Sequence, residues 1–429
     1  MRGSSLEVSI VAEQLRRAVP GGIGTYARGL VLGLSRLWAD PETLEPARVR
    51  VIASRSPFGV RDPLGALGLP LDTIGLPGAL LTRAWDRGLL AVPRSRPLGG
   101  ADPATVGGAD PATLGGADRT RASRADPAPG ARRRVVHSVS TLAPPVRGAA
   151  LSVTVHDLAW RRLPSAYPAR GRRWHEAALE RAARRAAVIV VPSEATAADL
   201  RAAGIGEERI AVIAEGADHL APPDDAGADE LLARLGISAP AGVGPAAPPT
   251  EGSDPAAPGG GGFLLSVGTL EPRKNLGRLL AAYAVARSRL AEPWKLLVVG
   301  PAGWGGPIEL PEGAVLAGAV SDGVLSALYR RARVFAYVPL YEGFGLPAAE
   351  AMASGTAVVA SSGVPSADGV GETVDPRDVE SIAAALVALS EDGPRRDSAI
   401  AAGSERAALL TWQAAAARHV ELWERLAGA

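Results

Sequence analysis

Short apolar runs alternate with amphipathic segments along most of the chain, and the apolar runs predict β-strands. Before residue 220 they are Val8–Ala12, Val49–Ala53, Val135–His137, Ser152–His156, Ala187–Val191 and Ile210–Ile213. After residue 262 they are Phe263–Val267, Lys295–Val299, Val334–Val338 and Ala357–Ser361. The spacing between them predicts helices over Thr25–Trp38, Arg172–Arg185, Thr196–Ala203, Asn275–Leu290, Val379–Leu389 and Thr411–Leu426. Short apolar strands that alternate with helices indicate an α/β protein with parallel sheets covered on both faces.

Two stretches rich in Gly, Pro and small residues interrupt this pattern. Residues 99–134 contain the near-repeat GGADPATVGGADPATLGGADRT, and residues 238–262 read SAPAGVGPAAPPTEGSDPAAPGGGG. Neither has apolar periodicity, so we predict that both are disordered.

The strand and helix pattern restarts after the second stretch, which predicts two Rossmann-like domains. The N-terminal domain spans 1–220, with 99–134 as an insertion, and the C-terminal domain spans 263–410. Residues 221–262 then form a largely disordered linker. Residues 411–429 form a C-terminal helix, for which one arrangement is packing back on the N-terminal domain.

Composition limits the class of protein. At 429 residues the chain suits two domains of ordinary size, and its formal charge of +1 argues against a general nucleic-acid binder. The absence of cysteine excludes disulfides, Cys-ligated zinc and a thiol nucleophile, and fits a reducing compartment. The first residues lead into a strand without an apolar signal segment, and no apolar run has the length of a transmembrane helix. We therefore expect a cytoplasmic protein.

Lysine is rare in this arginine-rich chain. Of 46 basic residues only Lys274 and Lys295 are lysines, and the only asparagine, Asn275, directly follows Lys274. A retained lysine indicates a compact point charge suited to phosphate, for which arginine is no equivalent. Arg273 and Lys274 follow the strand Phe263–Val267, where they could together hold a diphosphate. We expect Asn275 to cap the next helix.

Glycine-bearing turns mark two more candidate sites. Gly21 and Gly22 precede the helix Thr25–Trp38, where they either let the backbone approach an anion or form a plain turn. In the second turn Glu342 and Glu350 flank the sequence Gly-Phe-Gly-Leu-Pro-Ala-Ala. The backbone N–H groups of this turn and the helix that follows it would face an anion, with Glu350 one turn into the helix.

Two histidines stand at predicted strand ends. His156, followed by Asp157, can line a cleft and donate to a hydroxyl or phosphate near neutral pH. Alternatively Asp157 caps the next turn and His156 is a bystander. His137 is the second candidate. The basic stretch 161–185 is either a solvated helix face or a contact for an anionic acceptor or a membrane surface.

Together these residues resemble a retaining glycosyltransferase of the GT-B fold, glycosyltransferase family four. Glu342 and Glu350 match the family's E-x7-E motif, Arg273 and Lys274 its phosphate clamp, and Gly21 and Gly22 its N-terminal glycine loop. The sequence around the clamp, Val-Gly-Thr-Leu-Glu-Pro-Arg-Lys-Asn, is similar to that of bacterial mannosyltransferases that build cell-envelope glycans. The GT-B fold implies a cleft between the two domains.

The resemblance also implies roles. Arg273 and Lys274 would neutralise the departing nucleotide diphosphate, Glu342 would contact the donor sugar, and Glu350 the ribose. The backbone amides of Phe344, Gly345 and Leu346 would hold phosphate, Gly21 and Gly22 would lie against the donor, and His156 would touch the donor sugar or the acceptor hydroxyl.

The implied reaction moves a hexose, mannose favoured, from a nucleotide diphosphate sugar such as GDP-mannose to a hydroxyl of a glycan, lipid or natural product. Front-face attack with retention is the expected course. No D-x-D motif occurs, so we expect no metal and no other cofactor. The expected partners are the donor and the acceptor, with no nucleic acid. Peripheral contact at the inner face of a membrane is a further option. Two alternatives stay open: a nucleotide-sugar 2-epimerase and a non-catalytic sugar-nucleotide-binding subunit.

Overall fold

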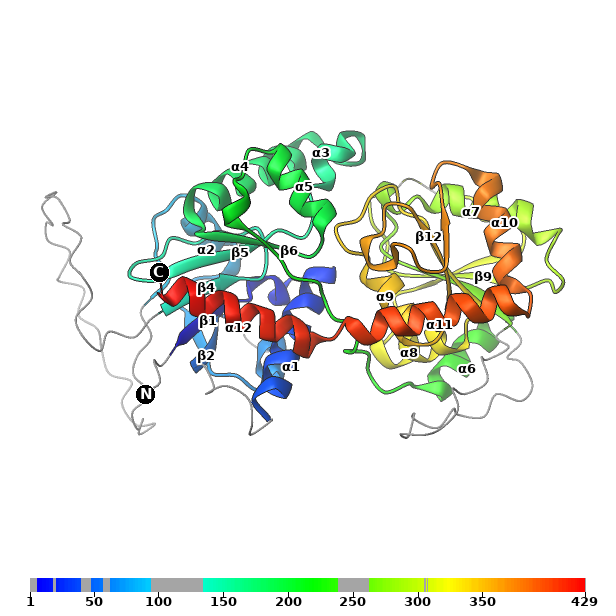
Figure 1. Cartoon of the computed structure of the whole chain (residues 1–429), viewed down its shortest axis with the longest axis horizontal. Helices are drawn as coiled ribbons and strands as arrows, with labels where there is room; N and C mark the ends of the chain where they lie inside the picture. The colour runs from blue at the N-terminus through cyan, green and yellow to red at the C-terminus, as the bar shows by residue number, and fades with distance from the viewer. Residues whose placement is uncertain are drawn as a thin grey trace, which may run out of the picture.

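A computed structural model describes residues 6–17, 21–39, 48–56, 62–93, 134–237, 262–304, 306 and 308–428. These residues form two lobes side by side, each built around a parallel sheet with helices on both faces (Figure 1). The prediction of two Rossmann-like α/β units is thereby confirmed. The two stretches predicted to be disordered, apart from Arg134 and Gly262, lie outside the described residues.

The N-terminal sheet has the strand order β3-β2-β1-β4-β5-β6-β7. Its strands are β1 (Glu7–Val11), β2 (Arg48–Ser54), β3 (Leu71–Ile74), β4 (Arg134–Ser138), β5 (Ala150–Thr154), β6 (Val188–Val191) and β7 (Ile210–Val212). Its helices are α1 (Gly21–Ala39), α2 (Gly78–Asp86), α3 (Ala159–Arg162), α4 (Ala169–Arg185) and α5 (Glu194–Ala202). The central strand β1 is almost wholly buried, because neighbouring strands and helices cover it on every side.

The C-terminal sheet has the strand order β10-β9-β8-β11-β12-β13. Its strands are β8 (Phe263–Val267), β9 (Lys295–Val299), β10 (Ala314–Gly318), β11 (Val334–Tyr337), β12 (Ala357–Ser361) and β13 (Glu372–Val374). Its helices are α6 (Asp225–Arg234), α7 (Leu276–Arg287), α8 (Asp322–Arg331), α9 (Leu346–Ala353), α10 (Val379–Ser390) and α11 (Pro394–Leu409). The last helix, α12, spans Trp412–Gly428.

The predicted linker 221–262 is wrong over its first part, because α6 is an ordered helix there. Asp224 caps its N-terminus by accepting a hydrogen bond from the Gly227 amide, and Leu231 and Leu232 are buried. The helix packs on α8, to which Asp229 is joined by an ion pair of 2.6 Å with Arg331. This segment therefore belongs to the C-terminal lobe.

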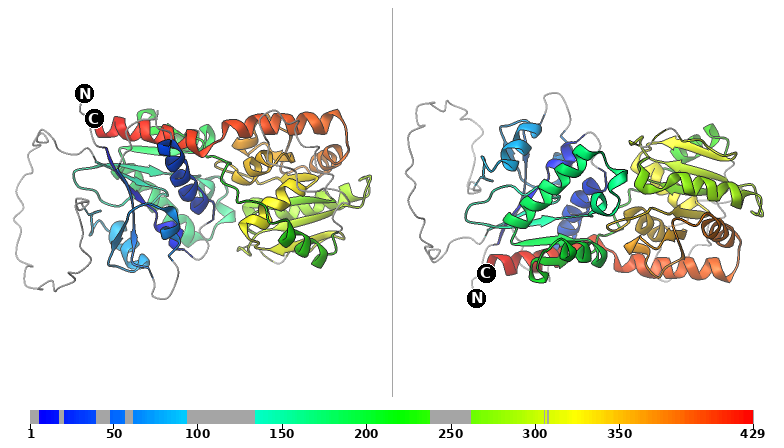
Figure 2. Two further views of the ribbon diagram at one scale, coloured as in Figure 1. Left: turned by 90° about the horizontal axis from the view of Figure 1, so that it is seen from below. Right: turned by 90° about the horizontal axis from the view of Figure 1, so that it is seen from above.

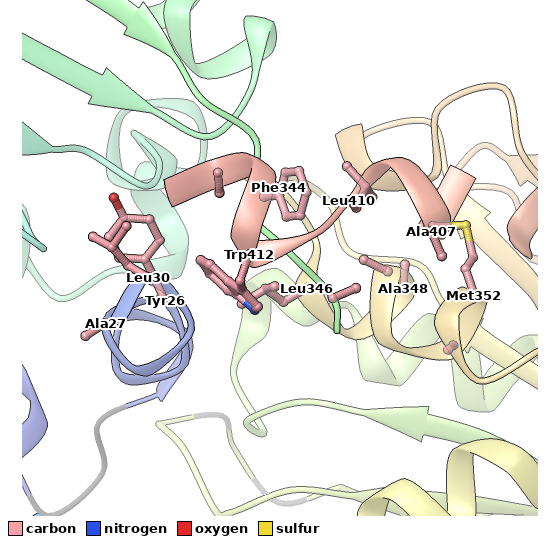
Figure 3. Packing of buried hydrophobic residues seen from close by; sticks show 14 of the residues in the cluster. Tyr26, Ala27, Leu30, Phe344, Leu346, Ala348, Met352, Ala407, Leu410 and Trp412 are labelled. Atoms are coloured by element: carbon pink, nitrogen blue, oxygen red, sulfur yellow. The ribbon is translucent and has the colours of Figure 1, made fainter. Parts of the chain in front are cut away.

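Helix α12 crosses from the C-terminal lobe and packs along α1 of the N-terminal lobe. Figure 2 shows α11 and α12 in line along one side of both lobes. Trp412 is fully buried and packs directly against two glycines. A Cβ added at Gly29 would stand 2.0 Å from the Trp412 ring, and one added at Gly216 would stand 2.3 Å from the Trp412 amide nitrogen. Figure 3 places Trp412 between Leu30 of α1 and Leu346 of α9. One apolar cluster thus joins the two lobes.

In each sheet the strand order reverses at one place, the topological switch point. The N-terminal sheet grows outward from β1 to β3 and then resumes on the other side of β1 with β4. The C-terminal sheet does the same around β8 and β11. Open parallel sheets bind ligands at the carboxyl ends of the strands that flank such a point. The loops after β1, β4, β8 and β11 are therefore where a site is expected. Within the described ranges, no helix combines the length and hydropathy that a membrane span requires.

Candidate active site

Four charged side chains meet at the carboxyl ends of β8 and β11. Lys274 Nζ lies 2.7 Å from Glu342 Oε1 and 2.6 Å from the hydroxyl of Tyr337, the last residue of β11. Arg273 reaches the same Glu342 oxygen at 2.7 Å and Glu271 Oε1 at 2.8 Å. The structure therefore brings together three residues that the sequence assigned to the site, Arg273, Lys274 and Glu342. They lie at the switch point of this sheet.

The shared carboxylate is strongly perturbed. Burial opposes its charge, but Arg273 and Lys274 outweigh burial and lower the pKa of Glu342 to about 2. Burial lowers the pKa of Lys274, and Glu342 offsets this only in part because the positive charge of Arg273 also lowers it. Burial raises the pKa of Glu271, against the lowering effect of both cations.

The four charges sum to zero, because Arg273 and Lys274 face Glu271 and Glu342. The two cations of the predicted clamp are thus already paired with carboxylates. A diphosphate that binds Lys274 would therefore compete with Glu342 for the ammonium.

The turn after Glu342 is held between the lobes. Ser193, which caps α5 of the N-terminal lobe, donates to the carbonyl of Gly343 at 2.6 Å. A Cβ at Gly343 would stand 1.7 Å from the carbonyl oxygen of His156, so only glycine allows this approach. Tyr341 adds a 2.7 Å hydrogen bond across the lobes to Asp199. The turn is therefore a junction of the two domains.

The N-terminus of α9 follows this turn. Gly345 adopts a left-handed conformation with φ 98°, which sets the entry into the helix. Within the described part of the chain, the backbone N–H groups of Phe344, Gly345 and Leu346 make no hydrogen bond. Donors of this kind at a helix start suit an anion. The side chains of Phe344 and Leu346 are instead buried in the cluster around Trp412.

Glu350 does not share the Glu342 cluster. One carboxylate oxygen accepts from the Tyr329 hydroxyl at 2.8 Å, and the other lies 3.1 Å from His219 Nε2. His219 in turn accepts from the indole N–H of Trp412 at 3.0 Å. A hydrogen-bonded chain thus runs from the start of α12 to Glu350.

Two cavities lie between the lobes. One of about 790 Å³ is lined by Glu342 and Phe344 together with Ser193 and Arg162. The other, about 360 Å³, is lined by Glu350 and residues of α1 and α8. The two glutamates of the E-x7-E motif therefore face different spaces.

His156 is fully engaged within the protein. Its Nδ1 lies 3.0 Å from the carboxylate of Glu215 and its Nε2 lies 2.9 Å from the carbonyl of Val139. Both partners accept hydrogen bonds, so the two contacts favour the imidazolium form, in which both ring nitrogens carry protons. Burial would lower the pKa of His156, but Glu215 raises it overall. Contact with a sugar would require one of these bonds to be exchanged. Asp157 accepts from the Ala159 amide at 3.0 Å, as the capping alternative predicted.

Three expectations from the sequence need correction. Gly21 and Gly22 stand at the first two positions of α1 rather than ahead of it, with Gly21 in a left-handed conformation at φ 61°. His137 is fully buried in β4, where its ring faces His419, so it does not line a cleft. Asn275 holds the N-cap position of α7 in a left-handed conformation, but its side chain makes no cap.

Asn275 instead ties loops together. Its amide donates to the carbonyl of Val338 at 2.9 Å and to that of Pro376 at 2.7 Å. It is the only described residue other than glycine with positive φ, which asparagine tolerates better than most residues. The loops after β8, β11 and β13 are thereby fixed relative to one another.

The sequence did not single out Tyr337 and His219, which contact Glu342 and Glu350. Tyr337 ends a predicted strand, and position at a strand's carboxyl end was the available signal. His219 carries no comparable signal, since its contact depends on how α12 returns. In the described residues, no three His, Cys, Asp or Glu side chains are grouped so as to hold a metal ion.

Comparison with known proteins gives a glycosyltransferase match on each lobe. Residues 251–406 match the family model described as Glycosyl transferases group 1, and residues 130–219 match Glycosyltransferase Family 4. The chain is 36% identical over 163 residues to O-antigen chain mannosyltransferase B from Escherichia coli, covering 35% of this chain and 43% of that protein. It is 35% identical over 172 residues to phosphatidyl-myo-inositol mannosyltransferase from Mycolicibacterium smegmatis, covering 37% and 44%. The matches thus span less than half of either relative.

Solved structures share the whole fold. Sucrose-phosphate synthase from Thermosynechococcus elongatus superposes with a TM-score of 0.62 at 18% identity, covering 98% of this chain and 99% of that one. Anabaena HepE in complex with UDP and glucose gives 0.58 at 15% identity, covering 99% and 100%. These likenesses confirm the predicted GT-B arrangement.

Proposed function

Because the chain belongs to the GT-B glycosyltransferases of family four, we propose that it transfers a hexose from a nucleotide diphosphate sugar to an acceptor hydroxyl with retention. Mannose from GDP-mannose is the favoured donor group, and the acceptor belongs to cell-envelope glycan synthesis. The names of the two bacterial relatives, both mannosyltransferases, support this choice. The proposal places the protein in the cytoplasm, where nucleotide sugars are made.

The observation that carries the proposal is the contact of Lys274 and Arg273 with Glu342 at the switch point of the C-terminal sheet. A carboxylate that can bind sugar hydroxyls lies within hydrogen-bond reach of cations that can bind a diphosphate. The unpaired N–H groups at the start of α9 supply further donors for phosphate oxygens. Both parts of a nucleotide sugar thus find matching groups in one place.

The proposed step breaks the bond between the anomeric carbon and the phosphate oxygen. The electron pair leaves with the diphosphate, and the acceptor oxygen forms the new bond on the same face of the sugar. The acceptor proton passes to the departing phosphate oxygen. Lys274 stabilises the charge that develops there, and removal of one such group costs on the order of 10²-fold in rate or more. We propose that Arg273 and Lys274 supply the positive charge without a metal.

Glu350 is proposed to contact the ribose of the donor. For this it would exchange His219 or Tyr329 for ribose hydroxyls, since both carboxylate oxygens are occupied. Its cavity is lined by α1 from Thr25 onward, and we propose that Gly21 and Gly22, at the start of the same helix, lie against the donor.

A screen of GDP, UDP, GDP-mannose and UDP-glucose by thermal unfolding tests the donor. A ligand at 100 times its Kd should stabilise the fold by about 2.7 kcal/mol, and we expect the guanine nucleotides to do so. NMR of the product then gives the anomeric configuration. Net inversion would overturn the retaining mechanism. Release of a 2-epimer without transfer would favour the epimerase, and tight binding without turnover would favour a binding subunit.

A further inference from the structure

Two tryptophans are exposed beside the site. Trp174 keeps 40% and Trp304 keeps 50% of its surface accessible. Among the described residues, the other large apolar side chains with comparable exposure are leucines. Only eight tryptophans occur in the whole chain, so two exposed indoles need a physical reason.

The two indoles are the ends of one aromatic row that crosses between the lobes. Trp304, in the loop after β9, lies 6.0 Å from the ring of Tyr167, and its N–H donates to the carbonyl of Ala166 at 2.9 Å. Tyr167 is 5.9 Å from His175, which is 4.9 Å from Trp174 on α4. The row therefore takes one end from each lobe.

This row adjoins the proposed active site. The loop that carries Trp304 is bound to the loop that carries Lys274, because the Leu270 amide donates to the carbonyl of Pro301 at 3.1 Å. A Cβ at Gly303 would stand 2.4 Å from the carbonyl oxygen of Leu270, so the two loops touch. Burial raises the pKa of Tyr167, and Asp157 and Arg273 lie close enough to act on it as well.

The geometry favours a saccharide over an apolar chain. Neighbouring rings in the row are inclined at 50° to 84°, so they present separate ring-sized faces rather than one flat surface. Trp174 follows two exposed arginines on α4, Arg170 one turn before it and Arg173 directly before it. A sugar ring has one face of C–H groups and a rim of hydroxyls, which matches an aromatic face with polar side chains around it.

We propose that Trp304 and Trp174, with Tyr167 and His175 between them, bind the sugar rings of a glycan acceptor. The proposal rests on the proposed glycosyltransferase function and names its acceptor class. Because its ends come from different lobes, the acceptor binds fully only when the lobes are in contact. The acceptor hydroxyl then approaches the donor from the side of α3 and α4.

Titration calorimetry with α-mannotriose and maltotriose, on the full chain saturated with GDP, tests the assignment. For the better of the two sugars we expect Trp174→Ala and Trp304→Ala to weaken binding about tenfold each, equivalent to about 1.4 kcal/mol. Trp174→Phe and Trp304→Phe keep a ring and should stay within about threefold of the wild type. Leu310→Ala is the matched control, since Leu310 is 40% exposed like Trp174. We expect it to bind as the wild type does.

The outcomes separate this proposal from the proposed function. If the wild type turns over a nucleotide sugar but binds neither trisaccharide, or if both alanine variants bind as the wild type does, the aromatic subsite is wrong and the transferase stands. If the wild type neither binds nor turns over any nucleotide sugar, the transferase itself fails and the subsite with it. Loss of binding to phosphatidylglycerol vesicles in the alanine variants, with trisaccharide affinity unchanged, would assign the indoles to a lipid surface instead.

Discussion

Replacing Glu342 with glutamine should cost stability in a way that depends on pH. The side chain is 8% exposed and its carboxylate contacts both Arg273 and Lys274. These cations bring its pKa from the ordinary 4.5 to about 2. At 1.36 kcal/mol per pKa unit this corresponds to about 3 kcal/mol. We therefore expect Glu342→Gln to lower the free energy of unfolding by about this amount at pH 7.

The pH dependence follows from the direction of the pKa change. The folded carboxyl holds its proton less tightly than the unfolded one, so its contribution is complete well above pH 4.5 and is lost as the pH falls toward 2. At pH 3 about 2 kcal/mol of it should be gone. The difference between wild type and Glu342→Gln should shrink by that amount between pH 7 and pH 3.

Urea unfolding at both pH values, followed by far-UV circular dichroism and tryptophan fluorescence, measures this difference. Glu312→Gln is the control, because Glu312 also pairs with an arginine but its side chain is 84% exposed. An exposed pair contributes about 1 kcal/mol at most, so this variant should differ little from the wild type at either pH. A Glu342→Gln deficit of equal size at pH 7 and pH 3 would refute the charge argument.

The remaining predictions concern Lys274, the packing of α12 on α1, and the buried side chain of His156. Lys274→Arg should reduce donor turnover at least tenfold, because a planar guanidinium cannot replace an ammonium held in 2.6 and 2.7 Å contacts, whereas Lys295→Arg should turn over normally. Gly29→Ala should destabilise the fold by about 2 kcal/mol or more, since its Cβ would stand 2.0 Å from the indole that begins α12. Gly277→Ala, which meets nothing within 4 Å, should not lower the thermal midpoint. The stability advantage of wild type over His156→Asn should be present below pH 6.5 and shrink as the pH rises through the raised folded pKa, as urea unfolding at pH 6 and pH 9 would show.

The sequence predicted the central strands and the edge strand β7, and missed the other three edge strands. Phe263–Val267, Lys295–Val299 and Ala357–Ser361 coincide with β8, β9 and β12. The strands without a prediction, β3, β10 and β13, all lie at sheet edges. An edge strand is only partly covered, so its sequence mixes polar and apolar residues and lacks the continuous apolar run that identifies a buried strand.

The site was predictable where the charged residues directly follow a predicted strand. Lys274 and Glu342 follow β8 and β11, which are neighbours in the sheet although 68 residues separate the pair in the chain. The partners of Glu350 could not be predicted in the same way. His219 reaches it because Trp412 docks on glycines of α1, which is a tertiary contact without local periodicity.

The charge balance of the cluster has a consequence for how a donor would bind. A diphosphate bound as proposed would compete with Glu342 for Lys274 and would draw the ammonium away from this carboxylate. The buried carboxylate would keep Arg273 and Tyr337 as partners but lose its Lys274 donor, and a hydroxyl of the donor sugar would replace that donor. A nucleotide diphosphate without a sugar offers no such replacement. GDP-mannose should therefore bind more tightly than GDP in the wild type, and Glu342→Gln should reverse or abolish that preference. Equal loss of affinity for both ligands in the variant would contradict the exchange.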